Sequence, residues 1–273
     1  MKTNQYCYWS VCTQGYAMMM ERCVHTARSS GVFRDFHVFT DRVVSDCQCY
    51  ESYCFDKTDS LFKLHFLKIG MSRLNFDYFV WVDADTTFVR NPMNILSALE
   101  GSPMHVPLEL NLTRLSDYEP DCVAKFLPDV GGEQPAALGR GRRTELEEMY
   151  RERGVADDVY VCGSAFWIIH HDAINVLCDL ALGFYHDARK RGIHVDIDSS
   201  LGYAMQMLAP DPTEHLALNR PDLWCCDYRV TCKDATEAWD WRHPLGGPSS
   251  RVRPAILHVP FRQSPEEIAG HRL

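Results

Sequence analysis

Two carboxylates one residue apart follow an apolar run of strand length. Asp83 and Asp85 come directly after residues 78–82, five consecutive apolar residues. Such a run predicts a strand buried on both faces, as in the middle of a parallel sheet. Ligands of open α/β sheets bind at the carboxyl ends of such strands. Because two carboxylates this close repel each other unless a cation lies between them, the pair predicts a Mg²⁺ or Mn²⁺ site shared with phosphate oxygens.

A plainer interpretation of the pair stays open at this point. Two Asp residues separated by one position are common by chance. Asp83 and Asp85 could cap the helix expected near Pro92, or lie solvated in a turn. The surrounding elements must therefore decide which chemistry the pair serves.

The elements that would position the pair alternate between strand and helix. Strands are expected at Tyr6–Thr13 and Phe36–Asp41, joined by a helix at Ala17–Arg28, and a helix at Leu61–Leu74 leads into the strand before Asp83. Further on we expect a short helix with Asn91 at its N-cap, a helix at 144–153, a strand at 159–169, helices at 171–191 and 198–208, and a last strand at 255–259. Residues 42–57 show no clear period. This order predicts an α/β fold with a mixed, mostly parallel sheet flanked by helices, and no linker divides it.

Composition and charge narrow the functional classes. The 273 residues are 46% hydrophobic with a net charge of −9, which argues against a general nucleic-acid binder. No leader peptide is visible and no apolar run reaches membrane-spanning length, so we expect a cytoplasmic chain without a transmembrane segment. Its twelve cysteines would then be reduced. A disulfide or metal site stays open between two groups of them: Cys47, Cys49 and Cys54, and Cys225, Cys226 and Cys232.

The string Asp83-Ala84-Asp85-Thr86-Thr87 resembles the first motif of haloacid-dehalogenase-type phosphatases. That resemblance implies Asp83 as nucleophile and Asp85 as general acid. The mechanism also needs a downstream Lys and a second acidic pair, for which Asp157-Asp158 is available. The motif would lie unusually deep in the chain, after a complete strand–helix–strand unit.

The order of motifs over nearly the whole chain resembles the GT-A type of nucleotide-sugar glycosyltransferase, and the opening third is similar to families 6 and 8. Besides the D-x-D string, Ile256-Leu257-His258 resembles the late strand that supplies a third metal ligand. The resemblance implies one GT-A catalytic domain over 1–273, with a nucleotide-binding half over about 1–100 and an acceptor-binding half over about 101–273. The chain departs from both families, since it lacks the His-Asp-Glu-Ser string and the Gly-x-x-Lys-Pro-Trp that follows the last His.

The glycosyltransferase resemblance implies a role for each of a dozen residues. The metal ligands would be Asp83, Asp85 and His258. The donor would contact Thr13, Tyr16, Lys63, Asp83, Ala84, Gly163, Ser164 and Arg262. Asp198, with Asp196 second, would act near the anomeric carbon, as general base in an inverting enzyme or as stabiliser or nucleophile in a retaining one. The plainer roles are a helix N-cap for Asp198 and a structural one for His258.

These observations predict a metal-dependent glycosyltransferase that uses Mn²⁺ or Mg²⁺. It would move a sugar from a nucleotide sugar, with UDP favoured, to a hydroxyl of a glycan acceptor, and retention is favoured over inversion. Two alternatives stay open: the phosphatase, and a catalytically inactive carbohydrate-binding protein on the same fold.

Overall fold

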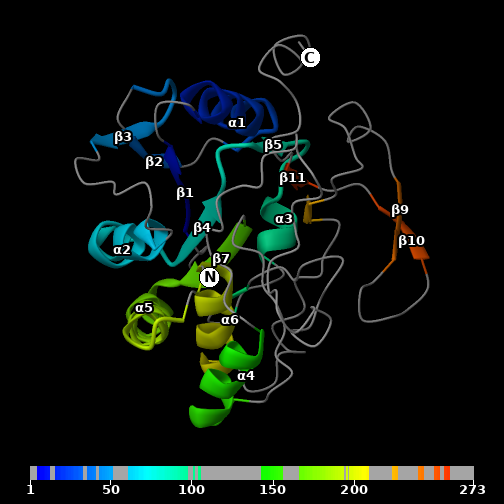
Figure 1. Cartoon of the computed structure of the whole chain (residues 1–273). Helices are drawn as coiled ribbons and strands as arrows, with labels where there is room; N and C mark the ends of the chain where they lie inside the picture. Colours follow the sequence, from blue (N-terminus) through cyan, green and yellow to red (C-terminus); the bar gives the residue numbers. More distant parts are fainter. Residues whose placement is uncertain are drawn as a thin grey trace, which may run out of the picture.

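A mixed sheet with helices on both faces organises the chain. The computed structural model describes residues 5–12, 16–32, 36–40, 43–51, 61–97, 101, 104–105, 143–155, 166–193, 195, 197–208, 223–226, 239–242, 249–252 and 255–258. Within these residues six strands pair in the order β3-β2-β1-β4-β7-β6 (Figure 1). They are β1 (Tyr6–Cys12), β2 (Phe36–Thr40), β3 (Gln48–Glu51), β4 (Tyr78–Val82), β6 (Met104–His105) and β7 (Phe166–His170).

The strand directions confirm the predicted α/β class with a mixed, mostly parallel sheet. β3, β2, β1 and β4 run parallel, whereas β7 pairs antiparallel with both β4 and β6. The sheet is therefore mixed and mostly parallel. β3 is an element that the sequence did not indicate, because it falls in 42–57, where no period is visible.

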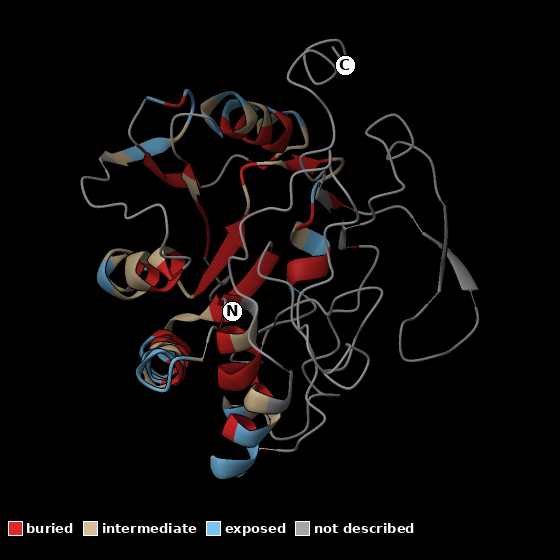
Figure 2. Ribbon diagram, viewed as in Figure 1, coloured by how far each residue is buried: buried red, intermediate tan, exposed pale blue. Residues whose placement is uncertain are grey.

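Helices pack on both faces of this sheet (Figures 1 and 2). On one face lies α1 (Ala17–Ser29), with α3 (Met93–Leu96). The other face carries α2 (Phe62–Ile69), α5 (Ile174–Lys190) and α6 (Ile197–Leu208). Beyond α5 and α6, the helix α4 (Arg143–Glu152) adds a separate cluster of buried side chains. Among the helices in the described ranges, none has the combined length and apolarity needed to cross a membrane.

β4 lies in the interior of the sheet, and all five of its residues are buried. Successive side chains of a strand point to opposite faces. Val80 and Val82 accordingly pack in the cluster beneath α1, whereas Phe79 and Trp81 pack in the cluster beneath α2, α5 and α6. The prediction of a strand buried on both faces is confirmed.

The helix predicted over Leu61–Leu74 is interrupted at Gly70. α2 ends at Ile69, and a 3₁₀ turn, η2 (Met71–Arg73), follows. A Cβ atom at Gly70 would lie 2.8 Å from Cζ of Phe39, so a larger residue there would require the Phe39 ring to shift. The hydrophobic period continues through this break, and it therefore did not reveal it.

A second, three-stranded sheet forms in the described residues beside the carboxyl end of β4. Its order is β5 (Thr86–Phe88), β11 (Ile256–His258) and β8 (Trp224–Cys226). β11 is antiparallel to β5 and parallel to β8. A two-stranded hairpin of β9 (Trp239–Arg242) and β10 (Ser249–Val252) completes the described strands.

The remaining predicted elements lie close to their expected positions. α4, α5 with its preceding 3₁₀ turn η5 (His171–Ala173), and α6 match the predicted helices to within a few residues. Near Pro92 the N-cap prediction was wrong by one position, because Pro92 is the N-cap and α3 begins at Met93. The Asn91 side chain still accepts a hydrogen bond from the Met93 amide at 2.9 Å. Of the strand predicted at 159–169, residues 159–165 lie outside the described residues.

Candidate functional site

Asp83 is held by two donors at the end of β4. One carboxylate oxygen, Oδ1, accepts hydrogen bonds from Nζ of Lys63 and from Nε1 of Trp81, each at 2.8 Å. Lys63 lies on α2, and its ammonium is also 4.5 Å from the centre of the Trp81 ring. The side chains of Lys63 and Asp83 are only 11% and 26% exposed, so this ion pair is screened far less than a surface pair. The two donors fix the orientation of the Asp83 carboxylate.

The alternation of side chains along β4 explains this arrangement. Asp83 follows Trp81 by two positions, so both side chains reach the same face of the sheet. That face is covered by α2, whose Lys63 is buried in its first turn. Trp81 was missed as a site residue by the sequence analysis, although its i−2 spacing from Asp83 was a usable signal.

A tight turn carries the two carboxylates. The amide of Thr86 donates a hydrogen bond to the carbonyl oxygen of Asp83 at 3.1 Å, which closes a four-residue turn. Asp83 and Asp85 therefore occupy the first and third positions of one turn, between β4 and β5. Ala84, between them, is buried beneath α1.

The charge of both carboxylates reaches the first turns of α1. Tyr16, directly before α1, has its pKa raised by burial and then by the charges of Asp85 and Asp83. Cys23, fully buried on α1, has a strongly raised pKa for the same reasons, burial first and Asp85 next. Both pKa values thus respond to the charges of the D-x-D turn. Tyr16 is 38% exposed, so a ligand can contact its ring there.

The pairing of β5 with β11 brings the end of the described chain to the D-x-D turn. In their register His258 lies opposite Thr86, the residue that follows Asp85. Residues directly opposite in an antiparallel pair have Cα atoms about 4.5–5.5 Å apart. The backbone of His258 is therefore adjacent to the turn that carries both carboxylates. Cys226 of β8 lies opposite His258 on the other side.

The donor set of the predicted metal site fits a hard divalent cation. Two carboxylates and an imidazole supply the oxygen and nitrogen ligands that suit Mn²⁺, and the backbone places the three residues together. Within the described side chains no cluster of three or more His, Cys, Asp or Glu is arranged to hold a metal ion. The side chain of His258 is not among them, so the third ligand stays a prediction.

Several predicted site residues lie outside the description. Thr13, Gly163, Ser164, Asp196 and Arg262 fall outside the described residues, and so does the acidic pair Asp157-Asp158 offered for a phosphatase. Asp198 is the second residue of α6, where the structure describes its backbone. Ile197, the residue before it, is buried in the same cluster as Trp81, so the start of α6 packs on the face of the sheet that carries Lys63.

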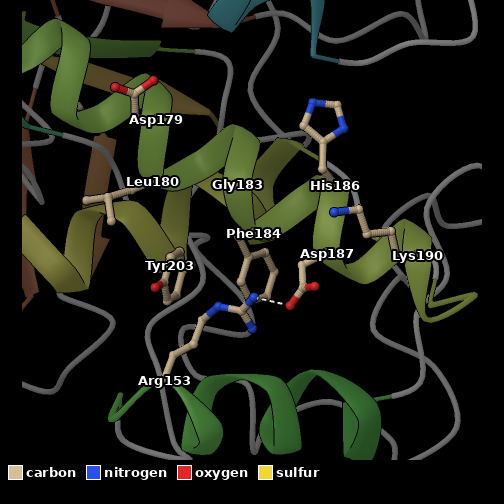
Figure 3. Close-up of a pocket in the computed structure, with 9 residues that line it drawn as sticks. All are labelled: Arg153, Asp179, Leu180, Gly183, Phe184, His186, Asp187, Lys190 and Tyr203. Atoms are coloured by element: carbon tan, nitrogen blue, oxygen red, sulfur yellow. Dashed lines mark hydrogen bonds and ion pairs between the residues drawn. The ribbon is translucent and has the colours of Figure 1, made fainter.

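A hollow of about 500 Å³ lies among α4, α5 and α6, and none of the predicted site residues described here lines it (Figure 3). Arg153 lines this hollow. Its guanidinium lies 5.3 Å from the centre of the Phe184 ring and 5.7 Å from that of the Tyr203 ring, and it forms an ion pair with Asp187. The hydrogen bond from Arg153 lowers the pKa of Asp187. Because these charges satisfy each other over an aromatic cluster, we interpret the hollow as structural.

Comparison with known proteins adds no family to this description. No protein-family model matches the chain, and a search of curated proteins finds no match either. The functional argument consequently depends on the residues and geometry given above.

Proposed function

We propose that this chain is a metal-dependent glycosyltransferase of the GT-A type. It transfers a sugar from a nucleotide sugar to a hydroxyl of a glycan acceptor; UDP is the favoured nucleotide and retention the favoured stereochemistry. The observation that carries the proposal is the pairing of β11 with β5, which puts His258 opposite Thr86 and next to Asp85. The pairing supports the proposal because two distant motifs that the resemblance connects meet at the carboxyl end of a central strand.

The residues around the D-x-D turn would have different roles in binding a nucleotide diphosphate. Lys63 and Trp81 orient Asp83 through the two hydrogen bonds to its Oδ1. Lys63 is also proposed to contact a phosphate oxygen of the bound diphosphate, as an ammonium donor. Tyr16, whose pKa is raised by burial and by the charges of Asp85 and Asp83, would offer its ring to the nucleotide.

Asp83, Asp85 and His258 would hold the cation. When bound, Mn²⁺ supplies Lewis-acid neutralisation of the charge that develops on the departing diphosphate. Asp198 is the carboxylate proposed to act near the anomeric carbon, where it stabilises positive charge on the sugar.

A thermal-shift screen of UDP-, GDP- and CDP-sugars, with and without Mn²⁺, tests the proposal. We expect one nucleotide class to stabilise the protein only when Mn²⁺ is present. A ligand at a hundredfold excess over its Kd adds about 2.7 kcal/mol to the free energy of unfolding, which is readily measured. No response to any donor, together with turnover of a phosphomonoester, would refute the transferase in favour of the phosphatase. Donor binding without transfer or hydrolysis of the sugar would indicate the inactive binding protein.

Two variants test the proposed roles of Asp85 and Asp198. Asp85→Ala should abolish the Mn²⁺-dependent part of the shift, whereas Asp179→Ala, at an exposed carboxylate on α5, should leave it unchanged. Undiminished Mn²⁺-dependent binding in Asp85→Ala would remove Asp85 from the ligand set. Asp198→Ala should slow transfer much more than it weakens donor binding, and a collapse of donor affinity would instead give Asp198 a positioning role.

A further inference from the structure

Two thiols lie side by side where the chain enters β3. The Sγ atoms of Cys47 and Cys49 are 3.7 Å apart, and both are free thiols. Cys49 is exposed and Cys47 is half-buried. The other thiols whose side chains the structure describes, on Cys7, Cys12, Cys23 and Cys178, are all buried. Within this set, Cys49 is the thiol that a reagent in solution can reach.

The backbone permits a bond between these two sulfurs. One residue separates Cys47 from Cys49, and two residues of extended chain span at most about 7 Å. Disulfides join Cα atoms about 4.4–6.8 Å apart, and the extended limit for this pair exceeds that range only slightly. The two sulfurs already lie close together in the structure, 3.7 Å apart. Closure requires the two sulfurs to approach from 3.7 Å to the disulfide bond length of about 2.0 Å.

In the reduced state both thiols are tied to one backbone group. Cys47 and Cys49 donate hydrogen bonds to the carbonyl oxygen of Val44, at 3.4 and 3.3 Å. The Val44 amide in turn donates to Sγ of Cys49 at 3.3 Å. Arg28, near the end of α1, donates to the carbonyl oxygen of Asp46 and anchors the same loop. The loop that holds the thiols is thus ordered by contacts that do not involve the D-x-D turn.

The two thiols differ in the order in which they can react. Burial, followed by the charge of Cys49 and a hydrogen bond with it, raises the pKa of the Cys47 thiol to about 12. The thiolate is the attacking species in disulfide exchange, so Cys47 is a poor first nucleophile at neutral pH. Two of these causes come from Cys49 itself. They disappear once Cys49 carries a disulfide, and Cys47 then ionises more easily.

We propose that Cys47 and Cys49 form a redox-active dithiol that a low-molecular-weight disulfide, such as glutathione disulfide, converts into an intramolecular disulfide. The Cys49 thiolate attacks one sulfur of glutathione disulfide, forms a mixed disulfide and releases one glutathione thiolate. The Cys47 thiolate then attacks Sγ of Cys49 and releases the second glutathione thiolate. In sum, two protein thiols are oxidised to one disulfide and one glutathione disulfide is reduced to two glutathione molecules. The reverse exchange with glutathione restores the dithiol.

Closure of the disulfide has a structural consequence at Val44. Both S–H groups are consumed, so the Val44 carbonyl loses the two hydrogen bonds that it accepts from them. Val44 is buried in the cluster beneath α1. Oxidation therefore removes two donors from a buried carbonyl group in the segment before β3. This device does not depend on the proposed glycosyltransferase activity.

The test maps the reaction on the full chain under native conditions. Trypsin cleavage after Arg42 and Lys57 releases a peptide that also contains Cys54, so all variants carry Cys54→Ser. The protein is treated with glutathione disulfide, quenched with acid and an alkylating reagent, digested, and analysed by mass spectrometry. We expect this peptide to lose two hydrogens, and to regain them on treatment with glutathione.

Single variants separate the two steps. In Cys47→Ser the peptide should retain one glutathionyl group on Cys49, because no second thiol resolves it. In Cys49→Ser modification of the peptide should be at least about tenfold slower, since the exposed nucleophile is gone. Cys178→Ala, which removes a buried thiol elsewhere, is the matched control and should react like the parent.

Three results would overturn the proposal. They are a mixed disulfide that persists in the parent, a modification rate in Cys49→Ser equal to that of the parent, and a disulfide from Cys49 to any cysteine other than Cys47. Circular dichroism of each variant before treatment establishes that the chains compared are folded. Cys47→Ala replaces Cys47→Ser where the serine variant is not folded.

Discussion

The hydrogen bond from Trp81 to Asp83 can be isolated by comparing two tryptophans of the same cluster. Trp81 and Trp167 are both almost fully buried, with ring centres 6.0 Å apart. The indole N–H of Trp81 donates to Asp83, whereas the N–H of Trp167 has no hydrogen-bond partner in the structure as described. Replacing either residue by Phe removes the same atoms from the same core. The pair of variants therefore differs mainly in the hydrogen bond.

The expected magnitudes follow from this difference. Each truncation leaves a cavity and destabilises the protein by about 1–2 kcal/mol, less than the 3–5 kcal/mol of a Trp→Ala change. Trp81→Phe also loses a hydrogen bond to a charged group, worth about 1.5–3 kcal/mol. Trp167→Phe removes a buried donor that is unsatisfied, which offsets part of its cavity term by about 1–3 kcal/mol. Trp81→Phe should consequently be the less stable variant by at least about 1.5 kcal/mol.

Urea denaturation followed by circular dichroism measures this difference. We expect a lower midpoint for Trp81→Phe at an unchanged m-value, which indicates a change in stability and not in the unfolded state. The phenyl ring that Trp81→Phe introduces keeps part of the contact with the Lys63 ammonium, so the comparison does not remove that interaction. Equal losses in the two variants, or a larger loss in Trp167→Phe, would refute the view that Trp81 orients Asp83.

Two further predictions concern charge and burial. Lys63→Met should destabilise the protein by about 1.5–3 kcal/mol because it leaves a partly buried carboxylate on Asp83 without its cation. Lys68→Met, at an exposed pair with Asp179, should have little effect on stability, because solvent screens that pair. Urea midpoints measure both variants, and equal effects would contradict the burial argument. Burial, opposed by the charge of Lys68, raises the pKa of the Cys178 thiol from 9.0 to about 12. An unfolded thiol ionises before the folded one, so this group's contribution to stability is complete below pH 9 and is lost as pH rises toward 12. Between pH 9 and pH 12 the free energy of unfolding, measured by urea melts, should therefore fall less in Cys178→Ala than in the parent. The difference between the two falls should reach up to about 4 kcal/mol. The same pH dependence in both proteins would show that Cys178 does not retain its proton.

The elements around the candidate site were predictable where a local pattern was long enough. Five apolar residues before Asp83 indicated a buried strand, and the helix expected at 171–191 corresponds to α5 with its preceding 3₁₀ turn. The interruption at Gly70 was not predictable. The contact of Gly70 with the ring of Phe39, a residue of another strand, is likewise absent from any local pattern.

The pairing between β5 and β11 shows more clearly what could not be predicted from the sequence. Each strand has three residues, too few for any period, and their partners are chosen by the packing of the whole chain. The resemblance connected His258 with the D-x-D string, but the sequence contained no physical signal for their adjacency. β3 was missed for a related reason, since an edge strand gains its order from backbone hydrogen bonds to β2 and needs no apolar face of its own.

The two carboxylates of the turn are not equivalent, although the sequence presents them as a symmetric pair. Asp83 has one oxygen committed to Lys63 and Trp81, on the side of the sheet that α2 covers. On the α1 side, Asp85 has the larger effect of the two carboxylates on the pKa of Tyr16. In the proposed metal site a cation would compete with the ammonium of Lys63 at Asp83, and we therefore propose Asp85 as the first carboxylate ligand. Asp83 would add its second oxygen, in the orientation that the hydrogen bonds from Lys63 and Trp81 fix.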